Sequence, residues 1–178
     1  MLKEMYPKMV IVTCLSHALH LVAKKIWANF PSVDLLIANL NKTFSKPSTR
    51  IQKFKDILPN VPLPPKPVIT RWGTWLNAAI YCSEYHNSLL TVFNQLNAED
   101  CAATCRSLLS DYSLANELAF LDSNFKILLK FIDFFQKTSL SISLALELLN
   151  ELERKFDLLT DKVERNFIKQ NSSLQCYY

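Results

Sequence analysis

Apolar residues recur at every third or fourth position along most of this chain, a spacing typical of amphipathic helices. The clearest stripes run over residues 75–96, 118–135 and 142–163. Each stripe would bury one face of a helix, so we expect these residues to form core rather than a functional site. A break near residues 138–139 would let the last two helices pack as an antiparallel hairpin.

Shorter amphipathic segments precede these stripes. We expect helices over residues 16–30, 32–45, 48–58 and, further on, 98–109. The first three begin at serines that can cap a helix, namely Ser16, Ser32 and Ser48. Pro31 would end the first helix. Its core-facing positions would be Leu15, Leu19, Val22, Ile26 and Phe30, with His17, His20 and Lys24 together on another face.

Two segments depart from the helical pattern. Residues 9–13 are β-branched and apolar, which predicts a short buried strand. Residues 58–69 are proline-rich and predict an extended linker, because proline cannot continue a helix. The only glycine, Gly73, lies within the sequence VITRWGTW and is interpreted as a conformational hinge. So little glycine argues against a strand-and-turn architecture, and the predicted fold is mainly α with one N-terminal strand.

Charge is distributed unevenly along the 178 residues. Residues 1–75 contain eleven Lys/Arg and three Asp/Glu, a net charge of +8, whereas residues 76–178 contain nine and thirteen, a net charge of −4. A basic first half is compatible with contact to phosphates, and a solvated basic surface explains it equally well. No apolar run approaches the roughly 20 residues that span a bilayer, so no membrane partner is expected.

Cysteine and histidine cluster in CLSHALH, at Cys14, His17 and His20. Zinc prefers such ligands, but a structural site needs four, and this spacing directs the outer side chains apart on a helix. The alternative is that Cys14 ends the strand inside the core while both histidines bond to nearby backbone. The five cysteines show no pairing pattern, which predicts free thiols in a reducing, intracellular compartment.

Arg71 and Trp72 form the second candidate site. An indole can stack on an unpaired base, and a neighbouring guanidinium can hold the adjacent phosphate. The alternative is that Trp72 and Trp75 anchor the linker in the core while Arg71 forms an ion pair. The sequence offers neither converging carboxylates for two metal ions nor a glycine-rich phosphate loop, so no catalytic residue and no cofactor is expected.

Taken in order, the MVIVTCLSHALH segment, the basic SKPSTRIQKFK segment, the proline-rich linker and VITRWGTW resemble hAT-superfamily transposases. The likeness is greatest to transposon-derived proteins described as CGG triplet repeat-binding-protein-like. Cys14 and His17 match the family's Cys-x-x-His motif, Trp72 its base-stacking tryptophan and Arg71 the basic partner. The resemblance implies an RNase H-like core interrupted by a helical insertion, with Asp, Asp and Glu residues binding two Mg²⁺ ions.

None of those three acids has a counterpart in this chain. We therefore expect an internal fragment of such a transposase that does not cut DNA. By the resemblance, residues 1–31 are a strand and helix left from the RNase H-like core. Residues 32–170 would be the helical insertion domain, including the linker at 58–69, and residues 171–178 a frayed tail.

The expected partner is DNA, as transposon ends, a single strand or a flipped base, and the resemblance implies a nuclear location. The expected contacts are Lys42, Lys46, Arg50, Lys53, Lys55, Arg71 and Trp72. The alternative is a helical protein-interaction module, either domesticated or a non-functional remnant, without a nucleic-acid role. Such a module could form a homo-oligomer through helices in residues 111–169.

Overall fold

The computed structural model describes residues 14–45, 48–96, 101–136, 141 and 143–158. Within these ranges the fold is mainly α, as predicted, and contains no strand beyond a single antiparallel bridge between Val68 and Arg71. The strand predicted at residues 9–13 lies outside the described residues.

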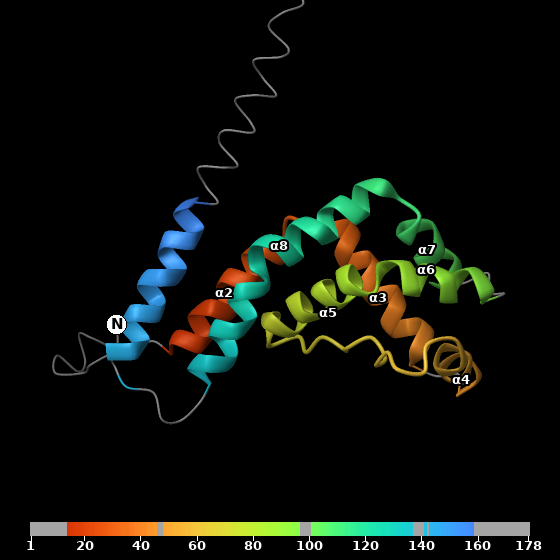
Figure 1. Ribbon diagram of the computed structural model, residues 1–178, viewed down its shortest axis with the longest axis horizontal. Coiled ribbons are helices and arrows are strands. Elements are labelled where there is room, and N and C mark those ends of the chain that lie inside the picture. Colours follow the sequence, from red (N-terminus) through yellow and green to blue (C-terminus); the bar gives the residue numbers. More distant parts are fainter. Residues whose placement is uncertain (1–13, 46–47, 97–100, 137–140, 142, 159–178) are drawn as a thin grey trace, which may run out of the picture. The chain divides into compact units, whose positions relative to one another are not determined.

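Helices follow one another along the chain (Figure 1). They are α2 (Leu15–Trp27), α3 (Pro31–Phe44), α4 (Ser48–Ile57), α5 (Trp72–Glu84), α6 (His86–Gln95), α7 (Cys101–Leu109), α8 (Tyr112–Phe135) and a further helix over residues 143–158. The chain divides into two compact units, Met1–Asp133 and Phe134–Tyr178, which we call unit 1 and unit 2. The predicted boundaries at residues 31 and 170 stay predictions.

Two of the predicted caps are wrong. Ser16 and Ser32 lie inside α2 and α3, whose N-cap residues are Cys14 and Phe30 without side-chain cap bonds. Pro31 begins α3 instead of ending α2, because proline at the first helical position loses no hydrogen bond and already has a helical φ. Just beyond the end of α2, the side-chain amide of Asn29 donates to the carbonyl of Lys25 at 2.8 Å and so satisfies a carbonyl of the last turn.

Unit 1 is held together by apolar side chains from every one of its helices. In it α2 packs on α5, α3 packs on α4, α5 and α7, and α6 packs on α7. The largest fully buried side chains are Val33, Leu36, Leu40, Phe54, Leu76, Leu89, Phe93, Leu109, Leu114, Leu118, Leu121 and Leu128. Each contributes about 1.5–3 kcal/mol through burial, so this set dominates the stability of the unit.

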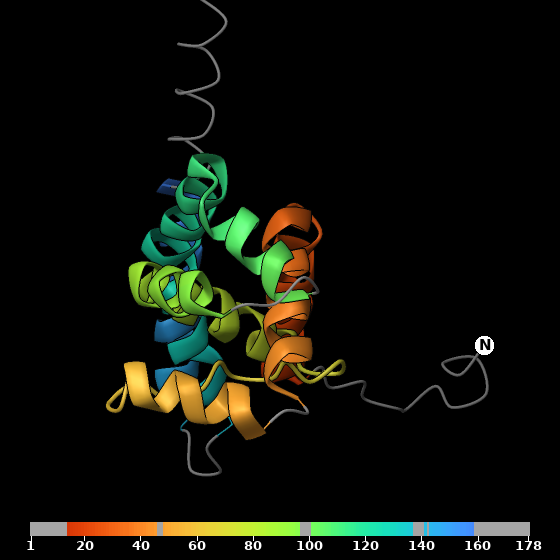
Figure 2. The same ribbon diagram turned by 90° about the vertical axis from the view of Figure 1, so that its right-hand side faces the viewer.

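The α3, α4 and α6 helices meet around one aromatic cluster. Phe44 makes edge-to-face contacts with Phe54 at 5.3 Å and with Phe93 at 5.9 Å between ring centroids. This geometry suits the quadrupoles of the rings. In Figures 1 and 2, α4 lies across the end of α3.

The core-facing side of α2 differs from the prediction. Ser16, Leu19, His20, Ala23 and Ile26 are buried, whereas Leu15 is 36% exposed. His20 therefore belongs to the core and does not share a surface with the exposed His17 and Lys24. The buried face is rotated because a polar group of α5 meets His20.

The predicted linker is free of helix from Leu58 to Arg71 (Figure 1). Its prolines are attached to α5 by Tyr81, whose hydroxyl donates to the carbonyl of Pro62 at 2.6 Å. Burial raises the pKa of Tyr81, which keeps this donor protonated at all physiological pH values.

The predicted stripe at 75–96 spans two helices, since α5 ends at Glu84 and α6 begins at His86. Nevertheless Trp75, Cys82, Leu89 and Phe93 are all buried, so the predicted phase is confirmed on both sides of the break.

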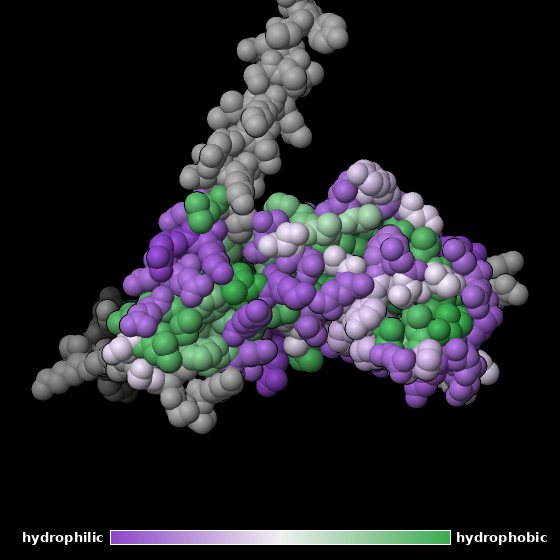
Figure 3. All heavy atoms as spheres, viewed as in Figure 1, coloured by the Kyte–Doolittle hydropathy of each residue, from purple (hydrophilic) through white to green (hydrophobic). Residues whose placement is uncertain are grey.

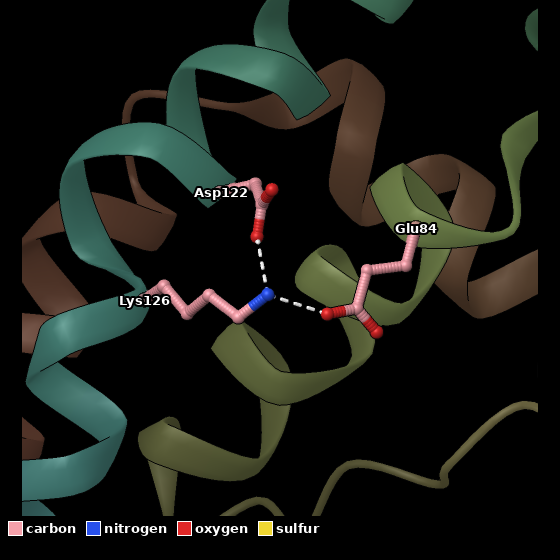
Figure 4. A network of polar contacts seen from close by, with 3 residues as sticks. All are labelled: Glu84, Asp122 and Lys126. Atoms are coloured by element: carbon pink, nitrogen blue, oxygen red, sulfur yellow. Dashed lines mark hydrogen bonds and ion pairs between the residues drawn. The ribbon is translucent and has the colours of Figure 1, made fainter.

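Helix α8 adds its stripe to the core and a charged edge to the surface. Leu118, Leu121, Leu128 and Ile132 are buried as predicted. On the outside, Lys126 pairs with Glu84 of α5 at 2.5 Å and with Asp122 at 3.2 Å (Figure 4). Hydrophilic residues gather over α5 and α8 in Figure 3. These exposed pairs position side chains but contribute little to stability.

Unit 2 is described only over residues 134–136, 141 and 143–158. In its helix, Leu152 is 4% exposed whereas Leu144, Leu146 and Leu158 are 41%, 56% and 59% exposed. Leu152 belongs to the predicted stripe and the three exposed leucines do not. The stripe therefore has the expected phase here, and the predicted hairpin with α8 stays a prediction.

Arg106 joins α7 to the end of α6. Its Nε donates to the carbonyl of Phe93 at 2.9 Å and its Nη2 to that of Leu96 at 2.5 Å. Carbonyl groups in the last turn of a helix have no partner within the helix, so Arg106 serves as a C-terminal cap supplied by another helix.

We predict that Arg106→Met lowers the free energy of unfolding by about 2 kcal/mol, because two charge-assisted hydrogen bonds are lost and two carbonyls lose their partners. Urea denaturation followed by circular dichroism measures the change. Arg154→Met is the matched control, since Arg154 is exposed and, within the described ranges, bonds only to the carbonyl of Asn150 in its own helix. Equal stability of both variants would contradict the capping role.

Candidate functional site

The site begins where α2 crosses the start of α5. The backbone N–H of Gly73 donates to Nδ1 of His20 at 3.0 Å. This amide lies in the first turn of α5 and has no acceptor within its own helix, so the imidazole satisfies it. The bond joins residues 53 positions apart and fixes how closely the two helices approach.

Gly73 is favoured by the small space around it and not by its backbone conformation. A Cβ atom there would lie 2.9 Å from Cδ1 of Ile132 and 3.1 Å from Cε1 of His20. Gly73 has no positive φ, so its backbone conformation does not itself require glycine, and the interpretation as a conformational hinge stays a prediction. An added methyl group would force the side chains of Ile132 and His20 to shift.

His20 is held in its neutral form. Burial, the Arg71 guanidinium and His17 all lower the pKa of His20, in that order of size. Because Nδ1 accepts the Gly73 proton, the ring proton of the neutral tautomer is on Nε2. Protonation of Nδ1 would break this hydrogen bond, because the Nδ1–H of His20 and the N–H of Gly73 would then be two donors facing each other.

Trp72 lies beside this contact, against two side chains of α2, Trp27 and Lys24. Its ring is 4.6 Å from that of Trp27, at an interplanar angle of 38°. The ammonium of Lys24 lies 5.7 Å from the Trp72 ring centroid, within the range of a cation–π interaction. Trp72 remains half-buried, so it is fixed in place while part of it stays accessible.

Trp75 has a different role. The residue is 3% exposed. Its Nε1 donates a hydrogen bond, 3.0 Å long, to Oδ1 of Asp34, which lies in the first turn of α3. The interpretation of Trp75 as a core anchor therefore fits the structure.

Thr74 holds Arg71 at the surface. The Thr74 hydroxyl accepts from the N–H of Val68 and donates to the carbonyl of Arg71, both at 2.7 Å. The Arg71 N–H donates back to the Val68 carbonyl at 2.8 Å, which closes a tight turn. Arg71 itself is exposed and makes no ion pair with the part of the chain that is described, contrary to the predicted pair.

A pocket of about 260 Å³ opens between these elements. We call it the tryptophan pocket; it is lined by Trp27, Asp34, Ile37, Ala38, Asn41, Pro67, Val68, Ile69, Trp72 and Trp75. Its walls are mostly apolar, and Asp34 supplies the charged group. Sequence reasoning missed Lys24, Trp27 and Asp34, because only the packing of α2 and α3 brings them to Trp72.

The predicted DNA contacts do not form one cluster. Lys42 is exposed in the last turn of α3 and Lys55 is exposed on α4. Arg50 and Lys53 are half-buried on α4, and Lys53 donates to the carbonyl of Gln95. Lys46 lies outside the described residues. Figure 1 shows α4 and the start of α5 at opposite ends of the linker, so the α4 cations are separate from Arg71.

The Cys14–His17 motif does not form a site in the structure. Cys14 is exposed, so its predicted place in the core is wrong; His17 is exposed as well. Among the described residues no group of three potential metal ligands converges, and all the cysteines there are free. Cys82 is buried, which raises the pKa of its thiol and leaves it protonated and unreactive.

No protein-family model matches this chain, and no curated protein or solved structure is significantly similar to it. No helix in the described ranges has both the length and the apolar character needed to cross a membrane.

We predict that Gly73→Ala lowers the free energy of unfolding by about 1 kcal/mol, because overpacking costs more than the better helix propensity of alanine returns. Thermal or urea unfolding measures the change. Adding Ile132→Val to Gly73→Ala removes the Cδ1 atom that the new methyl group would meet. The double variant should therefore lose less than the sum of the two single changes, and simple additivity would contradict the proposed clash.

We predict that the protein loses stability as the pH falls from 7.5 to 5. The folded state lowers the pKa of His20 below its unfolded value of 6.5, so the unfolded chain binds the proton more readily. This contribution to stability is complete above about pH 6.5 and declines as the pH falls toward the folded pKa. The melting temperature across this pH range measures the effect.

Two variants separate His20 from other titrating groups. Asn at position 20 offers an amide oxygen to Gly73 and cannot be protonated, so His20→Asn should flatten this part of the pH profile. His17→Asn is the matched control, because His17 is exposed, and it should keep most of the slope. A His20→Asn profile parallel to that of the wild type would exclude His20 as the cause.

Proposed function

We propose that this chain derives from an hAT-type transposase and binds DNA without cutting it, in the nucleus. One observation supports the proposal above others: Trp72 is a half-buried indole, backed by Trp27, flanked by Lys24 and preceded by the exposed Arg71. A rigid aromatic surface between two cations has the composition of a single-stranded nucleic-acid site.

Each part of this arrangement matches one part of a nucleotide. An unpaired base would stack on Trp72, which is worth about 1–3 kcal/mol per base. Arg71 and Lys24 would hold the phosphates on either side. Because Trp27 already fixes the Trp72 ring, little side-chain entropy is lost when a base binds.

The exposed cations Lys42 and Lys55 would extend the contact along a longer strand. Lys55 lies on α4, apart from the start of α5, and both cations would add affinity without sequence information. The family's three metal-binding acids have no counterpart in the sequence, so the proposed role is binding and not strand cleavage.

A second candidate is a protein-interaction module. It is favoured by the exposed apolar side chains beside the tryptophan pocket, where Ile69 is 86% and Val68 49% exposed. Exposed apolar groups next to a pocket are typical of protein contact sites. The homo-oligomer expected through residues 111–169 belongs to this candidate.

We predict that the protein binds a fluorescent single-stranded oligonucleotide at low salt and that Trp72→Ala weakens binding about 5- to 100-fold, the range given by one stacked base. Trp72→Phe should retain part of the affinity, because phenylalanine can also stack. Arg71→Gln should make the dependence of log affinity on log salt concentration less steep, by the amount that corresponds to about one phosphate contact. Fluorescence anisotropy measures all three effects.

Lys130→Gln is the matched control, since it removes one exposed positive charge from α8 and Lys130 does not line the tryptophan pocket. Its affinity should stay close to that of the wild type. Absence of binding, or equal binding by Trp72→Ala and the wild type, would reject the DNA-binding role. A concentration-dependent shift to larger species in gel filtration would then favour the interaction module.

A further inference from the structure

We infer that the tryptophan pocket selects an unpaired guanine, with Asp34 as the residue that distinguishes this base from the others. The inference rests on the proposed function, because it names the nucleotide that the Trp72 site would take. It is based on the carboxylate of Asp34 and on the aromatic walls around it.

The orientation of Asp34 is fixed by Trp75. Oδ1 accepts the hydrogen bond from Trp75 Nε1 at 3.0 Å, which leaves Oδ2 without a hydrogen-bond partner among the described residues. Asp34 also lines the pocket. An ionised carboxylate only accepts hydrogen bonds, so a ligand that meets it must offer donors.

Guanine alone among the four bases offers two neighbouring donors on its pairing edge. Its N1–H and N2 amino group lie side by side and can both donate to one carboxylate. Adenine and cytosine each place a ring-nitrogen acceptor beside their amino group, and thymine places its one donor between two carbonyl acceptors. Those acceptors would face the negative charge of Asp34 and weaken binding.

The size and walls of the pocket suit one planar base. Its volume of about 260 Å³ lies just below the range of about 300–1,000 Å³ that holds drug-sized ligands. Indole rings line it and can stack on a base. The Lys24 ammonium lies over the Trp72 ring, so a positively charged ligand would be repelled.

The test uses ten-nucleotide thymine strands that carry guanine, adenine, cytosine or thymine at one central position, with anisotropy measured on the wild-type protein. We expect the strand with guanine to bind about tenfold more tightly than the other three, within the range of one bidentate base contact. Inosine at the same position lacks the N2 amino group and should lose most of that preference. A 7-deazaguanine keeps the pairing edge and should retain it.

Asp34→Asn tests the residue itself. The amide keeps an oxygen for Trp75 and replaces the other oxygen by a donor, so the preference for guanine should disappear and the four strands should bind with similar affinities. Asp157→Asn is the matched control, because it removes the same charge from an exposed position in unit 2, and it should keep the preference.

The outcomes separate the inference from the proposed function. Equal binding of all four strands, together with weaker binding by Trp72→Ala, would reject guanine selection and leave DNA binding in place. Equal affinity for guanine and inosine would also reject it, and this result needs no protein variant. Failure to bind any strand would reject the proposed function and the inference with it.

Discussion

The contact between the Gly73 amide and His20 sets the geometry on which the rest of unit 1 depends. It brings α2 close to the backbone of α5, and glycine favours this approach because a methyl group there would crowd both Ile132 and His20. The same approach places Trp72 on Trp27. The aromatic stack and the tryptophan pocket are therefore consequences of one helix crossing. A polar bond at the centre of the crossing also fixes the register of the helices, which apolar packing alone would specify less sharply.

Helical periodicity predicted much of this fold because burial follows the spacing of apolar residues. Leu118, Leu128 and Leu152 face inward as their stripes require, and the proline-rich linker is free of helix. The same reasoning failed on α2, where His20 counts as polar and yet is buried. Its partner is 53 residues away, so no local pattern contains the information. The capping serines failed for a related reason, since packing and Pro31 determine where α2 and α3 begin.

The candidate site was only partly visible in the sequence. Arg71 and Trp72 are neighbours in the chain and could be singled out from their chemistry alone. Lys24, Trp27 and Asp34 come from two other helices, and each taken singly is an ordinary surface or core residue. Their meaning appears only when α2 places Lys24 and Trp27 against Trp72 and α3 places Asp34 in the pocket that Trp72 lines. The basic residues of α4 show the opposite error. By charge they group with Arg71 as expected contacts to DNA, whereas the fold places α4 and the start of α5 at opposite ends of the linker.

The two interpretations of the Arg-Trp motif, core anchor and base-stacking surface, are compatible once the tryptophans are considered separately. Trp75 is buried and bonded to Asp34, so it stabilises the fold and orients a carboxylate. Trp72 has one neighbour already stacked on it and cannot swing out to meet a ligand without losing that contact. A base would have to reach a ring that is fixed in advance, which lowers the entropic cost of binding and restricts the approach to the side open at the pocket. The same packing that stabilises the fold would therefore make the site selective. A tryptophan ring and a carboxylate held in fixed positions can distinguish bases that mobile side chains would bind equally well.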